Sequence, residues 1–273
     1  MKRLKSLLLR CLFFMLLVSC FIPVYIKAEE VLSAADIAVM SESVYPGKDQ
    51  KSRLTFIIRE ANNTQRKVIL HRFWKRYNKK GNIMSKVIVF HEYPPESMGS
   101  SFMSWSYNLK ANKQDDQWLY IPLLKVPQKL PEPVQELFGE SSLKPADMAP
   151  RDVELDNHKL IKEETIGNTD YYVIESIPKK KNVNYDYGKL IKWIKKDNFL
   201  KEKVEYYDYD GKPLKEQFIT WKNVGKAWVW EKVVIRNLQT SVEIILSVND
   251  IEVDTGLSDK IFTTDNMVSK LLK

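Results

Sequence analysis

The stretch VEYYDYDGKPLKEQF, residues 204–218, decides the fold class of this chain. Apolar and aromatic residues alternate with charged ones on both sides of Asp210-Gly211, a dipeptide that favours the tight turn of a β-hairpin. Gly167-Asn168 and Gln239-Thr240 mark weaker turns between further alternating runs. The pattern therefore predicts consecutive antiparallel strands.

The same rhythm extends over most of the chain. Residues around Leu54, Val68 and Val87 alternate in the first half, and 101–110 pairs with 116–121 across a polar loop. Six prolines between 122 and 150 exclude continuous strand there. In the second half, strands are expected near 158–166, 169–177, 188–196, 202–209, 213–222, 227–237 and 240–252.

Helical patterns are confined to the ends of this β region. Residues 31–44 predict an amphipathic helix that ends before Pro46-Gly47, and 265–272 predicts one or two helical turns. Ten to twelve antiparallel strands in one sheet must close into a barrel or be covered on the concave face. We therefore expect a mainly β (α+β) fold, with the early helix as the cover.

The amino terminus has the composition of an export signal. The chain of 273 residues carries a net charge of +8, but residues 1–28 hold five basic residues and no acidic one, which leaves 38 basic against 35 acidic residues. A basic start, an apolar run over 11–26 and the small residue Ala28 predict a removed signal peptide of residues 1–28. A retained anchor is the alternative. Most of the net positive charge therefore belongs to the predicted export signal, which directs the protein to the periplasm.

Both cysteines, Cys11 and Cys20, lie in this segment, so the remainder can form no disulfide and no cysteine-ligated zinc site. Leu17-Val18-Ser19-Cys20 resembles a bacterial lipobox, in which Cys20 would be lipidated and the protein anchored at the outer membrane. Apolar residues continue to Ile26, which favours a soluble exported form instead.

Catalytic and cofactor motifs are absent from the sequence. The three histidines, His71, His91 and His158, have no zinc-binding spacing, and no nucleophile elbow or phosphate loop occurs. We therefore expect no catalysis, no metal and no cofactor. The lysine-rich run at 192–203 superficially resembles a nucleic-acid strip, but acidic residues interrupt it and the chain is exported. A solvated hairpin face or attraction to anionic lipid headgroups remains, and no nucleic-acid partner is expected.

Tryptophan is abundant, with seven residues on expected strands. They either fill an ordinary core or line an apolar cavity suited to a lipid tail, and alternation alone does not separate the two.

Several segments in order resemble the outer-membrane lipoprotein-sorting protein family, the LolA-like group. They are PESMGSSF at 95–102, DQWLYIP at 116–122, the region 187–215 and LSDKIFT at 257–263. The insert at 137–155 departs from the family pattern. The resemblance implies a half-open antiparallel β-barrel with a helical lid, formed by residues 29–273 as a single domain.

The resemblance also implies a function. The protein would be a monomeric periplasmic carrier that binds lipid acyl chains or lipoproteins, in lipoprotein sorting or in lipid transport linked to a membrane exporter of the resistance-nodulation-division type. The alternative is a non-catalytic envelope sensor or accessory protein that binds a protein partner. A secreted hydrolase is a third reading, for which no nucleophile stands out.

Strand phase selects the residues expected to line the cavity. The helix would contribute Ala35, Val39 and Met40 as a lid over the opening. The cavity residues expected on the strands are Phe56, Ile58, Leu70, Trp74, Val89, Trp105, Trp118, Tyr172, Ile174, Trp193 and Trp221.

Overall fold

A computed structural model describes residues 31–77, 82–108, 113–132, 134, 143–144, 147–148, 151–181, 185 and 187–268. The expected signal peptide and Cys20 lie outside the described residues. The compact unit that contains all the strands begins at Ser33. No helix of the described residues has the length and apolar character that a membrane crossing requires.

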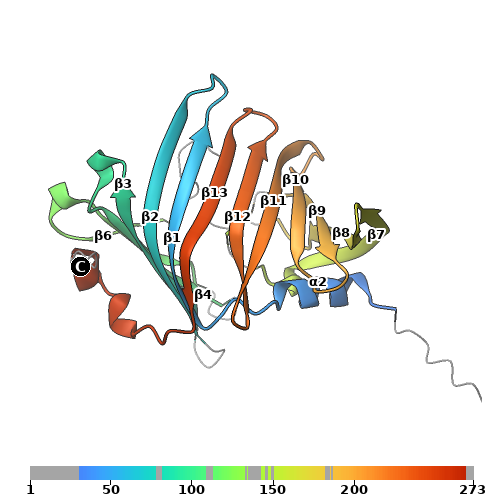
Figure 1. Cartoon of the computed structure of the whole chain (residues 1–273), viewed down its shortest axis with the longest axis horizontal. Helices are drawn as coiled ribbons and strands as arrows, with labels where there is room; N and C mark the ends of the chain where they lie inside the picture. The colour runs from blue at the N-terminus through green and yellow to red at the C-terminus, as the bar shows by residue number, and fades with distance from the viewer. Residues whose placement is uncertain are drawn as a thin grey trace, which may run out of the picture. The chain divides into compact units, whose positions relative to one another are not determined.

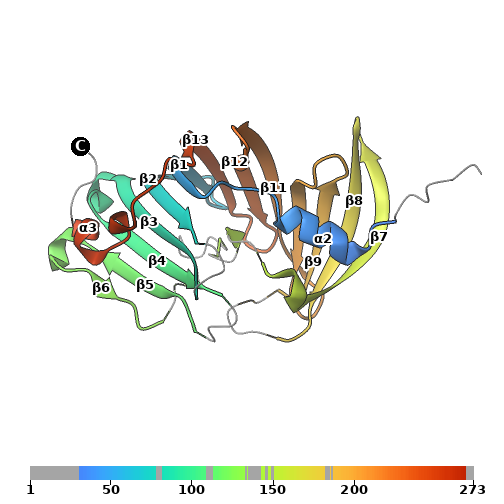
Figure 2. The ribbon, with the colours of Figure 1, turned by 90° about the horizontal axis from the view of Figure 1, so that it is seen from below.

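Thirteen strands form one antiparallel sheet, in the order β6-β5-β4-β3-β2-β1-β13-β12-β11-β10-β9-β8-β7. The chain runs outward from β1 to β6, crosses to β7 at the other edge and returns to β13, which pairs with β1 (Figure 1). Most neighbours are therefore joined by hairpins, as the turn signals predict. The sheet is not closed, because β6 and β7 remain at opposite ends (Figure 2).

The strands of the first half are β1 (Asp49–Arg59), β2 (Gln65–Arg76), β3 (Ile83–Tyr93), β4 (Ser101–Tyr107), β5 (Asp116–Tyr120) and β6 (Gln128–Lys129). Those of the second half are β7 (Asp156–Ile166), β8 (Thr169–Pro178), β9 (Lys189–Lys195), β10 (Lys201–Tyr207), β11 (Pro213–Val224), β12 (Ala227–Asn237) and β13 (Glu243–Val253). Nearly all the strand positions predicted from the sequence agree with these bounds.

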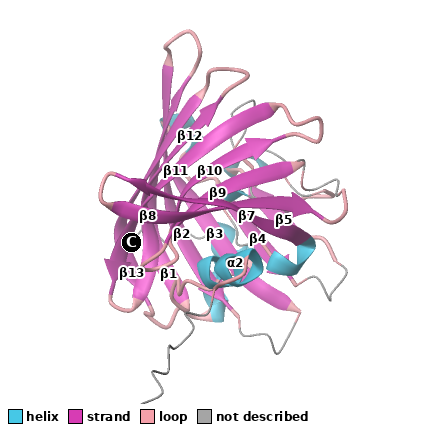
Figure 3. Ribbon diagram, turned by 90° about the vertical axis from the view of Figure 1, so that its right-hand side faces the viewer, coloured by secondary structure: helices cyan, strands magenta, loops and turns pink. Residues whose placement is uncertain are grey.

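Short helices connect and flank the strands, as Figure 3 shows in cyan. The 3-10 turns are η1 (Pro95–Ser97), η3 (Pro122–Leu124), η5 (Val153–Leu155) and η6 (Asp259–Ile261). Helix α2 (Ala34–Glu42) starts at a capping box of Ser33 and Asp36 and contacts β7, β8 and η5. Helix α3 (Thr264–Val268) contacts β4 and β5. The early helix therefore covers one end of the sheet.

The two faces of the sheet carry separate cores. Because directly paired residues of an antiparallel sheet project to the same side, the pairs Ile58–Ile244, Ile244–Ile235 and Ile235–Gln217 define one face, which we call the inner face. The opposite, outer face of β2 to β5 is covered by the carboxyl-terminal segment, where Phe262 and Met267 are buried against the sheet. The inner face is the candidate for function.

Candidate functional site

The middle of the inner face is apolar. Side chains from β1, β2, β11, β12 and β13 form one buried cluster, and the half-buried Trp221 and Trp230 pack against it with their rings 6.3 Å apart. Leu143 and Met148, from the proline-rich insert, also belong to this cluster. The buried strand residues of the cluster include Leu54, Phe56, Ile58, Val68, Leu70, Ile219, Val233, Ile235, Ile244 and Leu246.

Buried charged groups replace the apolar ones toward β9 and β10. Lys215 donates to Asp147 at 2.5 Å, and their side chains are 3% and 1% exposed. The Tyr187 hydroxyl donates to the same carboxylate at 2.7 Å. Burial, with the Asp147 charge, raises the pKa of Tyr187 far above its ordinary value, so this hydroxyl keeps its proton. The network ties the insert to β11.

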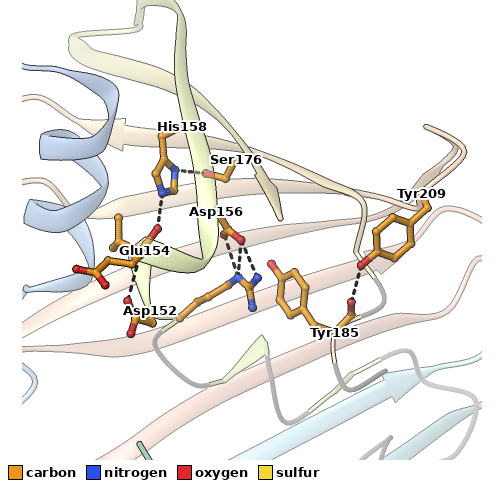
Figure 4. A network of polar contacts seen from close by, with 9 residues as sticks. Asp152, Glu154, Asp156, His158, Ser176, Tyr185 and Tyr209 are labelled. Carbon is orange, nitrogen blue, oxygen red and sulfur yellow. Dashed lines mark hydrogen bonds and ion pairs between the residues drawn. The ribbon is translucent and has the colours of Figure 1, made fainter. Parts of the chain in front are cut away.

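A second polar group lies beneath helix α2. Arg151 holds Asp156 through both carboxylate oxygens, the closest contact being 2.6 Å. His158 contacts Ser176 Oγ at 2.9 Å and the Val153 carbonyl oxygen at 3.0 Å (Figure 4). Because a carbonyl oxygen only accepts, Nε2 carries the proton and Nδ1 accepts from Ser176. Burial lowers the pKa of His158, which favours this neutral form.

Lys192 on β9 is the residue that sequence reasoning missed. It pairs in register with Val204 and Ile174, so it lies on the inner face, and it is only 4% exposed. Burial lowers the pKa of Lys192 to about 8, and the Lys201 ammonium adds to this effect. The signal was present in the sequence: a single lysine interrupts the apolar run of residues 190–194 in a buried strand.

The structure brings together part of the predicted cavity set. Phe56, Ile58, Leu70, Val89 and Trp221 belong to the cluster on the inner face. Tyr172, Ile174 and Trp74 lie on the same face by register, as partners of Ile194, Lys192 and Gln50, respectively.

Three predicted tryptophans lie on the outer face, which corrects their expected phase. Trp105 and Trp118 pack with the carboxyl-terminal segment, and Trp193 packs with Val173 and Tyr171. Both faces of these strands are apolar, so alternation did not show which face each ring occupies.

The helix residues expected to form the lid also have a different place. Val39 and Met40 are 50% and 40% exposed and Ala35 is exposed, whereas Ile37 and Ala38 are buried. The helix therefore packs through the other side of its apolar stripe.

A hollow of about 380 Å³ lies on the outer face, where its lining includes Thr220, Lys232 and Asp250. Its polar lining does not suit an acyl chain. Among the residues that the structure describes, no cluster of metal-ligating side chains occurs.

Comparisons with known proteins place this geometry in context. A family model described as "-like: Uncharacterized protein" matches residues 84–269. A search of curated proteins finds no match.

Solved structures share the fold. A DUF1329 family protein from Desulfovibrio piger is 22% identical, with a TM-score of 0.76 over 86% of this chain and 97% of its own. An outer membrane lipoprotein-sorting protein domain from Vibrio parahaemolyticus is 24% identical, with a TM-score of 0.73 over 86% and 98%. A LolA superfamily protein from Nitrosomonas europaea is 20% identical, with a TM-score of 0.63 over 86% and 99%. The LolA-like, open-barrel fold predicted from the sequence is confirmed.

Proposed function

Because the chain belongs to the family of uncharacterized proteins whose model matches residues 84–269 and has a LolA-like fold, we propose that it is a periplasmic carrier of lipid acyl chains or lipoproteins. The observation that carries the proposal is the apolar cluster in the middle of the inner face of an open sheet. This function requires no catalytic group.

The energy available on such a face is sufficient for binding. Burial of apolar surface contributes about 0.8 kcal/mol per methylene, so ten buried methylenes contribute about 8 kcal/mol, which corresponds to roughly micromolar affinity. Ordering of the chain and of the ligand reduces this value. The insert residues Leu143 and Met148 occupy part of the face, so a ligand would share it with them or displace them.

The distribution of tryptophans between the two faces provides a test. A stearate that carries a doxyl spin label quenches nearby indoles, and Trp221 and Trp230 lie on the inner face whereas Trp105 and Trp118 lie on the outer face. We expect the spin-labelled fatty acid to quench the protein saturably. We further expect Trp230→Phe to reduce the quenched fraction and Trp105→Phe to increase it.

Trp105→Phe is a suitable control because the indole nitrogen of Trp105 has no hydrogen-bond partner among the described residues, so the substitution breaks no hydrogen bond there. Quenching that is absent, or that is reduced by Trp105→Phe rather than by Trp230→Phe, would contradict acyl binding on the inner face. Absence of lipid binding together with capture of a specific envelope protein would support an accessory role instead.

Export and partnership complete the proposal. We propose that residues 1–28 direct export and that the mature protein works in the periplasm, with or without an acyl group on Cys20. The mass of the mature protein tests both statements, since diacylation adds a discrete increment. Binding to an exporter of the resistance-nodulation-division type stays a prediction, which crosslinking in the native envelope would test.

A further inference from the structure

Lys192 lies in an otherwise uncharged row that crosses the inner face. The register partners Ile58, Ile244, Ile235, Gln217 and Val204 lead from β1 to Lys192 on β9, all on one side of the sheet. Because neighbouring strands are about 4.8 Å apart, the three spacings from Ile235 to Lys192 span about 14 Å. An extended acyl chain on the apolar cluster therefore reaches Lys192 with its end.

Three other cations in this part of the structure are each paired with a carboxylate. Arg151 pairs with Asp156, Lys201 pairs with Glu42 at 3.0 Å, and Lys215 pairs with Asp147. In the described part of the chain, Lys192 has no hydrogen-bond or ion-pair partner, although it is 96% removed from solvent. Counted with Lys192, these four cations and three carboxylates of the described residues carry a net charge of +1.

An uncompensated buried ammonium is costly, because it loses hydration without gaining a partner. A bound anion would reduce this cost, because it would give the ammonium a charged partner. A cation or a neutral headgroup would not relieve it. The charge balance therefore favours an anionic ligand at this place.

A second buried donor without a partner lies in the same group of charges. The Tyr185 hydroxyl is buried and has no hydrogen-bond partner among the described residues. Its ring stacks on Arg151, whose guanidinium carbon is 3.5 Å from the ring centre, and Figure 4 shows the hydroxyl directed toward Asp156. Tyr185 and Lys192 share Arg151, Asp156 and Glu42 as electrostatic neighbours.

We propose that Lys192, assisted by the Tyr185 hydroxyl, binds the anionic headgroup of an amphiphile whose acyl chain lies on the apolar part of the inner face. The headgroup is a carboxylate or a phosphate, since both present charged oxygens to an ammonium and a hydroxyl. This inference rests on the proposed carrier function and adds to it the chemical class of the ligand.

Three ligands with the same chain separate the headgroup from the acyl chain: dodecanoate, methyl dodecanoate and dodecyl phosphate. Displacement of the spin-labelled stearate at pH 7 gives their affinities. We expect the wild type to bind both anions more tightly than the ester. We expect Lys192→Met to weaken anion binding about tenfold to hundredfold, the effect of losing a hydrogen bond to a charged group, and to leave ester binding unchanged.

Lys195→Met is the matched control, because Lys195 lies on the same strand but pairs with Tyr171 on the outer face. It should leave all affinities unchanged. Equal affinities of Lys192→Met and wild type for the anions would overturn the inference while the carrier function stands. If no ligand with a twelve-carbon chain binds the wild type, both the carrier function and the inference fail.

Inorganic phosphate separates a lipid headgroup from a free anion. Phosphate that displaces dodecanoate at low millimolar concentration would show that the site takes free anions and would overturn the amphiphile assignment. Lys192→Met should fold, because replacing a buried charge by an apolar side chain of similar length is often neutral or stabilising.

The pH dependence of the wild type gives a readout that needs no variant. The groups that face Lys192 are Glu42 on α2, Lys201 on β10, Asp156 and His158 on β7, and Arg151. His158 has a lowered pKa and Tyr185 a raised one, so neither titrates between pH 7 and 9. Dodecanoate affinity should fall across this window as Lys192 deprotonates, whereas ester affinity should stay flat; a flat dodecanoate profile would overturn the inference.

Discussion

Asp147 anchors the proline-rich insert to the sheet, and its replacement should be strongly destabilising. Asp147→Ala leaves the Lys215 ammonium buried without its carboxylate, and the two side chains are 3% and 1% exposed. Removing one partner of a buried ion pair costs about 3–5 kcal/mol, against a total stability of about 5–15 kcal/mol for a domain. Asp147→Ala should therefore remove a large part of the free energy of unfolding.

Urea unfolding followed by far-ultraviolet circular dichroism measures this loss. With a slope of about 1–3 kcal/mol per molar urea, the midpoint should fall by at least about 1 M. Lys215→Met should cost less, because Asp147 keeps the Tyr187 hydroxyl and the Lys144 amide as donors. The double variant should recover part of the Asp147→Ala loss, since it buries no unpaired charge.

The exposed pair Lys51–Glu252 provides the control, because its side chains are 37% and 54% exposed. Glu252→Ala should cost no more than about 1 kcal/mol, as surface pairs do. A loss for Asp147→Ala as small as this control, with no recovery in the double variant, would refute the claim that a buried pair fixes the insert.

Three further predictions concern the backbone and pH. Gly188→Ala should lower the free energy of unfolding in urea by at least about 2 kcal/mol, because the added Cβ would overlap the backbone of Asp208. Gly211→Ala should lower it by about 1 kcal/mol, because the added Cβ meets open space but the φ of +80° is unfavourable for alanine. Equal losses for the two variants would contradict the packing argument. Burial alone would raise the pKa of Glu42, but the positive charges of Lys201 and Lys192 hold this pKa below its ordinary value. Glu42→Gln should therefore lower the free energy of unfolding at pH 7, and the difference from wild type should disappear as the pH falls through the native pKa. A difference that does not change with pH would refute this. Burial lowers the pKa of His158, so wild-type stability should fall more steeply than that of His158→Gln as the pH drops from 7 to 5, and parallel curves would show that His158 does not contribute.

The sequence predicts the strands well because their signals are local. The Asp210-Gly211 turn joins β10 to β11, with Gly211 at a φ of +80°, and the turns at Gly167 and Gln239-Thr240 also join neighbouring strands. Hairpins bring sequential strands together, so local alternation and turn chemistry are enough to give most of the topology.

The face of each side chain is predicted less well. Where a strand is buried on both faces, as in β9, alternation disappears and a tryptophan such as Trp193 can belong to either core. Bulges add to the difficulty, because Glu231 is an extra residue of β12 opposite the step from Thr220 to Trp221, and the break in alternation brings Trp230 to the inner face beside Trp221. The buried pair Asp147–Lys215 joins residues 68 positions apart, and no local pattern indicates it.

The most direct test of the carrier function is native mass spectrometry of the protein purified from its own envelope. We expect a monomer that retains an amphiphile with an acyl chain and an anionic headgroup, and we expect Lys192→Met to retain less of it than Lys195→Met. A protein whose mass is that of the mature polypeptide alone, even under the gentlest release conditions and at every stage of growth, would contradict the account.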